Sequence, residues 1–295
     1  MHKLVAIDLD GTLLNKNGII TNKTKQILNQ IIKEKQIQIV LASGRPIDSI
    51  KTISKEIGNL QYLIAGNGAA IYDIQKEEII YQKFLKKQKA IQIAKICEEN
   101  SIYYNIYTSK EIITNKLKCN VLVYHKENQM KSEKNKTKIN IVENVEKYLQ
   151  EKEEVEILKI TVCDENETIF KSILQKLKKI KGIEVLEISH MSRKIIQQGT
   201  NEIPINYFYT EITLKDIDKW NAIEFLINKL NIKKEEVIAI GDNLNDKKMI
   251  ENSGHGMAMK GSTPEITKIA NSVTNFDNNH DGAAEKLLEI LNNEY

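Results

Sequence analysis

Short apolar runs alternate with segments of helical apolar spacing along the first part of the chain. Apolar runs, which are typical of strands buried on both faces, occur at Leu4–Ile7, at Ile37–Ala42 with Gln38 as its one polar residue, and at Tyr62–Ala65. Asn22–Lys35 carries apolar residues at helical spacing, and a second helix is expected after Pro46. Because strands that alternate with helices form parallel sheets, the carboxyl ends of these strands should share one edge, where such sheets bind ligands.

The pattern changes after residue 68. Ala70–Ile74 and Glu78–Gln82 predict a hairpin across a polar turn, and residues 84–211 then predict a separate α+β insert. Within the insert we expect helices over 86–100 and 167–181, strands over 102–108, 120–125 and 157–163, and an exposed polar loop over 125–138.

The first kind of alternation returns after the insert. Lys219–Leu230 has helical spacing, Val237–Ile240 is another buried strand, and further helices are expected near Lys247 and after Asp281. The sequence therefore predicts an α/β core formed by residues 1–83 and 212–295, interrupted by an inserted α+β domain over residues 84–211.

Two carboxylates follow the first predicted strand directly, in the segment Asp8–Thr12 (Asp-Leu-Asp-Gly-Thr). Gly11 permits the sharp turn that brings both to the edge of the sheet. Because alternate residues of an extended chain share a face, Asp8 and Asp10 can point at one ligand. An ordinary acidic turn is the alternative, but packing alone rarely ends a buried strand with such a pair.

A second acidic cluster, Gly241–Asp246 (Gly-Asp-Asn-Leu-Asn-Asp), follows the strand Val237–Ile240. Two acidic strand ends on one edge of a sheet predict a single metal site. Three or four carboxylates around a small dication suit Mg²⁺, which keeps several waters and commonly takes a phosphate oxygen as a ligand. Calcium fits less well, since the spacing of an EF-hand loop is absent.

Groups suited to phosphate stand at two further positions. Ser43-Gly44-Arg45 follows the strand Ile37–Ala42, where a hydroxyl and the amides of a glycine turn can hold phosphate oxygens. Lys219 opens a predicted helix, and a lysine at such a place is usually a solvated side chain. We assign Lys219 a function only because it follows the other motifs in a particular order along the chain.

These motifs, in this order, resemble the haloacid dehalogenase superfamily of phosphohydrolases, and within it the Cof-type subfamily with a C2-type cap. The resemblance rests on Asp8–Thr12, Ser43–Arg45, the Gly-Asn-Gly-Ala turn at 66–69, Lys219 and Gly241–Asp246. It implies a Rossmann-like parallel-sheet core, an inserted α+β cap, and Mg²⁺-dependent hydrolysis of a small phosphorylated metabolite. A sugar phosphate is the expected substrate.

The resemblance also implies roles for single residues. Asp8 would be the nucleophile and a metal ligand, Asp10 the general acid and base and a ligand through its backbone carbonyl, and Asp242 the third ligand. The groups expected around the phosphoryl group are the Leu9 and Gly44 amides, Ser43, Lys219 and Asn245, with Asp246 supporting the metal shell and Arg45 and Asn67 beside the substrate.

The charges of these groups fit such roles. An isolated Asp has a pKa of about 3.9, so Asp8 should be ionised at neutral pH. It can attack a phosphate dianion only if Mg²⁺ and Lys219 cancel the repulsion. Asp10 must begin protonated, give its proton to the departing alkoxide and then take one from water; neighbouring carboxylates would raise its pKa. Phosphoryl transfer needs little more than in-line placement and charge neutralisation.

The departures from the family pattern include one residue beside the motif lysine and one segment of the insert. Trp220 occupies the position after the motif lysine, where the family usually has glycine. It either packs as a helix residue, on the face continued by Ile223 and Leu226, or stacks on the substrate. The segment Ser192–Asn206 is an expected addition to the insert.

Composition narrows the class of protein. The 43 Lys and Arg residues and 40 Asp and Glu residues leave a net charge of +3, which indicates neither a nucleic-acid nor a membrane partner. Cys97, Cys119 and Cys163 lack zinc-site spacing and are expected to be buried thiols. His255 and His280 are expected to be structural residues or residues at the rim of the site. No stretch is apolar enough for a signal peptide or a membrane span, so we expect a cytoplasmic protein. We expect this protein to be a monomer or a homodimer.

Three classes of function are compatible with these motifs. The first is a phosphatase, with a phosphomutase as its chemical neighbour. The second is a signalling receiver module, whose acidic pair normally precedes the phosphoacceptor strand and which has no insert of this size. The third is a catalytically silent protein that binds phosphorylated ligands, and the presence of every motif residue argues against it.

Overall fold

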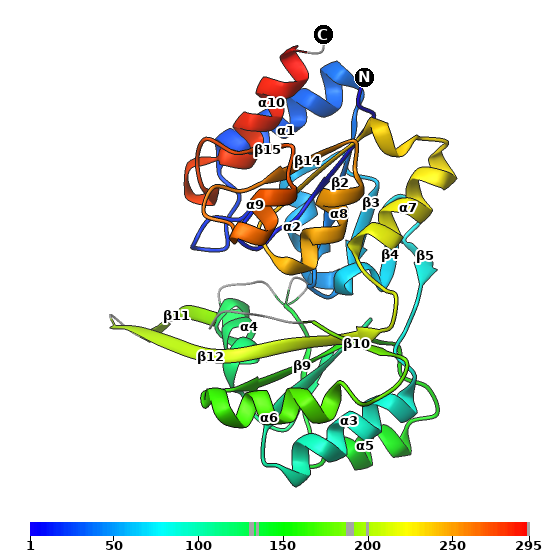
Figure 1. Cartoon of the computed structure of the whole chain (residues 1–295), viewed down its shortest axis with the longest axis vertical. Helices are drawn as coiled ribbons and strands as arrows, with labels where there is room; N and C mark the ends of the chain where they lie inside the picture. The colour runs from blue at the N-terminus through cyan, green and yellow to red at the C-terminus, as the bar shows by residue number, and fades with distance from the viewer. Residues whose placement is uncertain (130–132, 134–135, 187–191, 199–200, 294–295) are drawn as a thin grey trace. The chain divides into compact units, whose positions relative to one another are not determined.

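The chain divides into two compact units. The computed structural model describes residues 1–129, 133, 136–186, 192–198 and 201–293. Unit 1, the core, comprises Met1–Gln82 and Asp218–Tyr295, and unit 2, the cap, comprises Lys83–Ile217 (Figure 1). The expected second boundary, between residues 211 and 212, falls inside strand β12 (Asn201–Leu214). The last residues of β12 still pair with β10 (Ile183–Val185) in the cap sheet, so the cap extends to Ile217.

The core is built on a sheet that, within the described residues, has eight strands in the order β15-β14-β13-β1-β2-β3-β4-β5. The strands are β1 Leu4–Ile7, β2 Gln38–Ala42, β3 Tyr62–Ala65, β4 Ala70–Asp73, β5 Glu78–Gln82, β13 Val237–Gly241, β14 His255–Ala258 and β15 Ser272–Val273. β1 lies between β2 and β13 and is parallel to both. Its four residues are completely buried, as the continuous apolar run predicted. The predicted hairpin is formed by the antiparallel strands β4 and β5.

Helices cover both faces of the core sheet (Figure 1). They are α1 Asn22–Lys35, α2 Ile47–Ile57, α7 Lys219–Leu230, α8 Lys247–Asn252, α9 Pro264–Ile269 and α10 Gly282–Asn293. α1 begins after Thr21, whose side chain accepts a hydrogen bond from the Thr24 amide, and its buried face carries the apolar residues that predicted it. α7 begins with a capping box between Asp218 and Asn221, which fixes the first turn of the helix that carries Lys219.

Trp220 packs inside the core. Its side chain is 8 % exposed and belongs to the apolar cluster that contains Ile223, Leu226 and the β1 residues Leu4 and Ala6. The interpretation of Trp220 as a packed helix residue is therefore confirmed.

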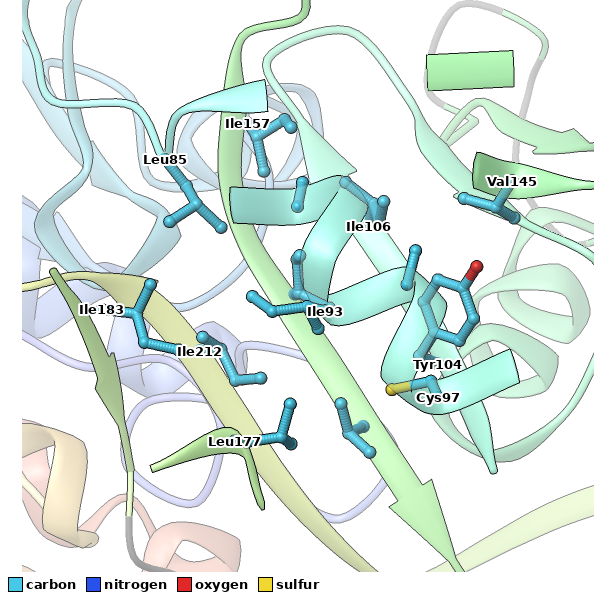
Figure 2. Packing of buried hydrophobic residues seen from close by; sticks show 14 of the residues in the cluster. Leu85, Ile93, Cys97, Tyr104, Ile106, Val145, Ile157, Leu177, Ile183 and Ile212 are labelled. Atoms are coloured by element: carbon cyan, nitrogen blue, oxygen red, sulfur yellow. The ribbon is translucent and has the colours of Figure 1, made fainter. Parts of the chain in front are cut away.

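The cap has a second sheet, whose described strands follow the order β10-β12-β9-β6-β7-β8, with β11 paired to β12 only. The remaining cap elements are α3 Lys87–Glu99, β6 Tyr103–Thr108, β7 Ile112–Thr114, α4 Cys119–Gln129, β8 Ile139–Ile141, α5 Val145–Glu151, β9 Ile157–Asp164, α6 Glu167–Leu177 and β11 Ser192–Gln198. Side chains from α3, α5 and α6 pack with one face of the sheet in an apolar cluster that includes Ile93, Ile106, Val145 and Leu177 (Figure 2). The cap thus has a hydrophobic core of its own.

The prediction of a strand over residues 120–125 is wrong, because this segment lies in helix α4. Its apolar residues are consecutive, and a short apolar run does not distinguish a strand from a helix. Only Cys119 and Val121 of α4 are fully buried. The expected polar loop over 125–138 is helical as far as Gln129, while residues 130–132 and 134–135 lie outside the described residues.

The expected added segment, Ser192–Asn206, forms a two-stranded ribbon with its neighbours. β11 pairs antiparallel with the first half of β12, from Ser192 opposite Tyr207 to Gln198 opposite Asn201. The second half of β12 pairs with β9. Within the described residues β11 has no other strand partner, so this ribbon extends the cap sheet along β12 (Figure 1).

The cysteines match their prediction. Cys97, Cys119 and Cys163 are free and buried in the cap, and burial raises the pKa values of the Cys97 and Cys163 thiols. None of the described helices is long and apolar enough to cross a membrane.

Gly68 provides a test of how the core is assembled. It has a φ of 98°, and a Cβ built on it would lie 2.0 Å from the Asp218 carbonyl oxygen and 3.1 Å from the Lys219 amide nitrogen. Gly68→Ala should therefore lower the free energy of unfolding by about 3 kcal/mol, because backbone overlap adds to the strain of a positive φ.

Gly18→Ala is the matched control in a thermal or urea unfolding experiment. Gly18 has a φ of 72°, and a Cβ added to it would meet nothing within 4 Å. The substitution should cost only about 1 kcal/mol. Equal losses for the two variants would contradict the close approach of residue 68 to the start of α7.

Candidate active site

The site lies where β1 and β13 end side by side in the core sheet. The parallel register pairs Ile7 with Ile240, and the Asp8 amide continues it by donating to the Ile240 carbonyl oxygen at 3.0 Å. Asp8 and Asp242 therefore leave adjacent strands at the same edge. The sequence placed both carboxylates here because each follows an apolar run, and parallel pairing brings the two strand ends together.

Gly11 makes the approach of these two strand ends sterically feasible. Its φ is 87°, and a Cβ at this position would lie 2.4 Å from Oδ2 of Asp242. The hydroxyl of Thr12, which is buried, donates to Oδ1 of Asp242 at 3.2 Å. Sequence reasoning gave Thr12 no role, although its place in the Asp8–Thr12 segment was the available signal.

Three carboxylates converge at this edge. Single oxygen atoms of Asp8, Asp242 and Asp246 all lie within 4.8 Å of one another. Asp246 is fully buried, and its Oδ2 accepts hydrogen bonds from the backbone amides of Asp242 at 3.0 Å and Asn243 at 3.1 Å. Asp246 therefore fixes the loop that carries Asp242, as a supporting residue should.

Lys219 joins two of these carboxylates. Its side chain is fully buried, and Nζ donates to Oδ1 of Asp8 at 2.5 Å and to Oδ1 of Asp246 at 2.6 Å. The residues are far apart in sequence but are brought together by α7, whose first residue is Lys219. Both oxygens of Asp246 are thus occupied, whereas Asp8 and Asp242 are better placed to bind a cation.

The buried charges do not balance. Three carboxylates carry a charge of −3 when ionised and Lys219 carries +1, which leaves −2. Burial raises the pKa of Asp8 to about 7, and the charges of Asp246 and Asp10 add to this effect, while Lys219 opposes it. Burial and the charges of Asp8 and Asp246 also raise the pKa of Asp242 well above its ordinary value. Without a cation, Asp8 is therefore ionised less readily at neutral pH than the isolated Asp on which the sequence expectation was based.

Lys219 responds in the opposite sense. Burial lowers its pKa, but the charges of Asp246 and Asp8 outweigh burial and raise the pKa above the ordinary lysine value. Lys219 is therefore a permanent cation. The excess of two negative charges, presented by hard oxygen donors, fits a small dication such as Mg²⁺.

Asp10 is turned toward Arg45. Nε of Arg45 donates to Oδ2 of Asp10 at 2.8 Å, and a terminal nitrogen of Arg45 donates to Oδ1 at 2.7 Å. Arg45 also donates to the Ser49 hydroxyl at 3.3 Å. The Arg45 side chain is 9 % exposed and that of Asp10 is 44 % exposed, so a largely buried guanidinium holds a carboxylate at the rim of the site.

The Ser43–Arg45 segment forms a turn at the end of β2. The Ser43 amide donates to the Ile64 carbonyl oxygen at 2.9 Å, and the Ser43 hydroxyl accepts from the Arg45 amide at 3.2 Å. Ser43 is buried. The Leu9 and Gly44 amides belong to the turns after β1 and β2, at the strand ends where the sequence expected them.

Asn67 and Asn245 are in direct contact. Nδ2 of Asn245 donates to Oδ1 of Asn67 at 3.2 Å. The sequence placed both residues near the substrate but did not connect them, since they belong to different motifs.

The two histidines of interest have structural contacts. Nε2 of His255 is 2.8 Å from the Ser272 hydroxyl, which links β14 to β15. Nδ1 of His280 is 2.6 Å from Oδ1 of Asp277 in the turn before α10. These contacts agree with the structural role expected of both residues.

Comparison with known proteins places this arrangement in a family. A family model described as haloacid dehalogenase-like hydrolase matches residues 5–287. The phosphatase YwpJ of Bacillus subtilis is 26 % identical to this chain over 298 residues, which cover 98 % of this chain and 100 % of YwpJ.

Solved structures share the fold. A haloacid dehalogenase-like hydrolase from B. subtilis has a TM-score of 0.79 at 23 % identity, and covers 98 % of this chain and 99 % of its own. The subclass IIB sugar phosphatase BT4131 has a TM-score of 0.74 at 21 % identity, and 98 % of each chain is covered.

The charge imbalance predicts how stability depends on pH and metal. Because the pKa of Asp8 is raised above its unfolded value, the metal-free folded chain binds an extra proton between about pH 4 and pH 7, and its stability should fall as the pH rises through this window. Stabilisation by added Mg²⁺ should therefore grow from pH 5 to pH 8. Differential scanning calorimetry with Mg²⁺ or EDTA measures this as a widening difference in Tm.

Asp8→Asn supplies the comparison. It removes one of the two carboxylates whose pKa values are raised, and with it a negative charge that raises the pKa of the other. The metal-free variant should therefore be more stable than wild type at pH 8, and its response to Mg²⁺ should be smaller and flatter with pH. A response to Mg²⁺ that is independent of pH in the wild-type chain would contradict the prediction.

Proposed function

Because the chain belongs to the haloacid dehalogenase-like hydrolases and is a phosphatase of that family, we propose that it hydrolyses a small phosphorylated metabolite through an aspartyl-phosphate on Asp8, with Mg²⁺ as cofactor. The observation that carries this proposal is the position of Asp8. Its carboxylate lies at a strand end, buried, beside a permanent cation and next to two further carboxylates. A nucleophile in such a place attacks only when the charge of the phosphate is neutralised.

The proposed first step forms a bond between a carboxylate oxygen of Asp8 and the phosphorus atom. The bond between phosphorus and the leaving oxygen breaks, and Asp10 gives that oxygen a proton, so the alcohol leaves neutral. In the second step water attacks the phosphorus of the aspartyl-phosphate, Asp10 takes a proton from the water, and Asp8 and inorganic phosphate are regenerated.

The residues around Asp8 would hold the phosphoryl oxygens. Lys219 is fixed by Asp246 and carries a permanent charge, which suits it to a dianion in a dry site. The other proposed phosphate ligands are the Ser43 hydroxyl, the Leu9 and Gly44 amides and the Asn245 amide group. These groups surround the strand ends of β1, β2 and β13, which supports in-line placement of the substrate.

Asp8, Asp242 and the Asp10 backbone carbonyl are the proposed metal ligands. Bound there, Mg²⁺ would neutralise the phosphate dianion and the buried carboxylates together. Asp246 keeps the ligand loop in place through the two amide hydrogen bonds it accepts.

Arg45 sets the state of Asp10 in this proposal. Both Asp10 oxygens accept hydrogen bonds from Arg45, so Asp10 is held as a carboxylate in the arrangement described. To protonate a leaving oxygen, one Asp10 oxygen must leave Arg45 and carry a proton. When Asp10 has given up this proton, both hydrogen bonds from Arg45 can form again, and they return the Asp10 carboxylate to the same orientation before the second step.

A sugar phosphate is the proposed class of substrate, with support from fold-level analogy to the sugar phosphatase BT4131. The phosphomutase alternative uses the same two steps, except that a second substrate hydroxyl replaces water. Release of inorganic phosphate distinguishes the two.

The first test is phosphate release from p-nitrophenyl phosphate and a panel of sugar phosphates. Wild type should turn over with Mg²⁺ and stop with EDTA, and Asp8→Asn should lower kcat by at least about 1,000-fold. Acid-quenched wild type should carry one phosphoryl group on the peptide that contains Asp8, as measured by mass spectrometry.

Asp277→Asn is the control for this test. Asp277 caps the turn before α10 and Asn caps equally well, so turnover should be unchanged. Full activity of Asp8→Asn, or a phosphoryl group on another residue, would reject Asp8 as the nucleophile.

Arg45→Lys tests what Arg45 does. Lysine keeps the charge but cannot make the two parallel hydrogen bonds, so kcat should fall about 10-fold with KM within roughly twofold of wild type. Ser49→Ala removes only the third contact of Arg45 and should change kcat less than about twofold. A large rise in KM with unchanged kcat would show instead that Arg45 binds the substrate.

A further inference from the structure

The turn Gly66–Gly68 connects three phosphate-binding segments of the core. The Gly66 amide donates to the Arg45 carbonyl oxygen at 3.1 Å, and the Asn67 amide donates to the Ser43 carbonyl oxygen at 3.0 Å. Gly68 lies against the backbone of Asp218 and Lys219. The Asn67 side chain reaches Asn245. One short turn thus touches the segments that carry Ser43, Lys219 and Asn245.

The backbone of this turn is unusual. Gly66, Asn67 and Gly68 have successive φ values of 59°, 58° and 98°. Glycine adopts such angles without strain, whereas any other residue is disfavoured there, although asparagine is among the better tolerated. A glycine at position 67 would complete the same backbone more easily, so the backbone alone does not explain the asparagine.

The Asn67 side chain has a specific contact in the site. It is 5 % exposed, and Oδ1 accepts a hydrogen bond from Nδ2 of Asn245 at 3.2 Å. A primary amide has two N–H groups. Because one N–H of Asn245 donates to Asn67, the plane of the Asn245 amide is fixed, and its NH₂ group rather than its carbonyl oxygen faces Asn67. The second N–H then has a defined direction.

We infer that Asn67 is a positioning residue, which orients the Asn245 amide so that it donates to a phosphate oxygen. This inference rests on the proposed function and adds to it the device that selects the donor end of Asn245. A carboxamide rotated by half a turn would present its carbonyl oxygen to the phosphate, and two acceptors repel. The Asn67–Asn245 contact therefore acts on phosphate affinity more than on the chemical step.

Asn67→Gly isolates the side chain, because glycine keeps the positive φ without strain. The binding of inorganic phosphate in the presence of Mg²⁺ is measured by isothermal titration calorimetry, which needs no turnover. The dissociation constant for phosphate should rise about 5- to 10-fold, and KM for p-nitrophenyl phosphate should rise similarly with kcat within about twofold.

Two controls separate positioning from folding. Asn67→Ala removes the same hydrogen bond and adds backbone strain, so its Tm should be lower than that of Asn67→Gly while its phosphate affinity is the same. Asn59→Gly makes the same substitution at an exposed asparagine with a φ of 56°, and should leave phosphate affinity unchanged.

A double-mutant cycle with Asn245→Ala decides whether Asn67 acts through Asn245. Asn67→Gly should cause no further loss of phosphate affinity when Asn245 is already alanine. The inference is overturned if the losses of phosphate affinity in Asn67→Gly and Asn245→Ala add up in the double variant. It is also overturned if phosphate affinity among the Asn67 variants changes in step with Tm, or if Asn67→Gly binds phosphate as tightly as wild type. If the wild-type chain shows no turnover but its phosphate binding still depends on Asn67, the proposed function is rejected and the inference about Asn67 stands.

Discussion

The interaction on which the site depends is the contact of one buried ammonium group with two buried carboxylates. Lys219 donates to Asp8 and Asp246, and all three side chains are almost completely removed from water. Taking these charges out of water is costly, and only their mutual attraction and the backbone amides bound by Asp246 offset the cost. With Asp242 added, the carboxylates exceed what one lysine can neutralise. The excess of negative charge makes this carboxylate group a candidate site for a cation.

The fold allows this concentration of charge because its backbone segments approach unusually closely. Gly11 leaves room for Asp242, and Gly68 leaves room for the first residues of α7. At Gly241, a Cβ would lie 2.4 Å from the Cβ of Asp246. Gly11 and Gly68 thus allow segments that are distant in sequence to approach, and Gly241 allows the close turn that brings Asp246 back against the end of β13. Parallel backbone pairing of β1 with β13 brings Asp8 and Asp242 close together, because both strands end at the same edge of the sheet.

The cap is stabilised differently. Its apolar cluster is formed by one face of its sheet and the helices α3, α5 and α6 (Figure 2). The cluster under α7 in the core consists of other residues. The ribbon of β11 and the first half of β12 lies along one strand and leaves the order of the other cap strands intact.

The sequence by itself determined most elements of the core and the residues that follow its strands. β1, α1, β3 and α7 have the bounds that apolar periodicity predicted, because buried strands and amphipathic helices impose local patterns with fixed periods. In the cap the same method took α4 for a strand, since a short run of consecutive apolar residues fits either element. α5 was not predicted, although Asn144, which caps it by accepting from the Lys147 amide, was a local signal.

Only the tertiary structure decided how the motif residues meet and which charges they bear. Lys219 and Asp8 are 211 residues apart, and no local pattern gives their distance. The raised pKa of Asp8 comes from burial by the whole core, the orientation of Asp10 from Arg45, and the contact of Asn67 with Asn245 from two separate turns. Hydrophobic periodicity is encoded residue by residue along the chain. Desolvation and hydrogen bonding at the site depend on neighbours that only folding brings together.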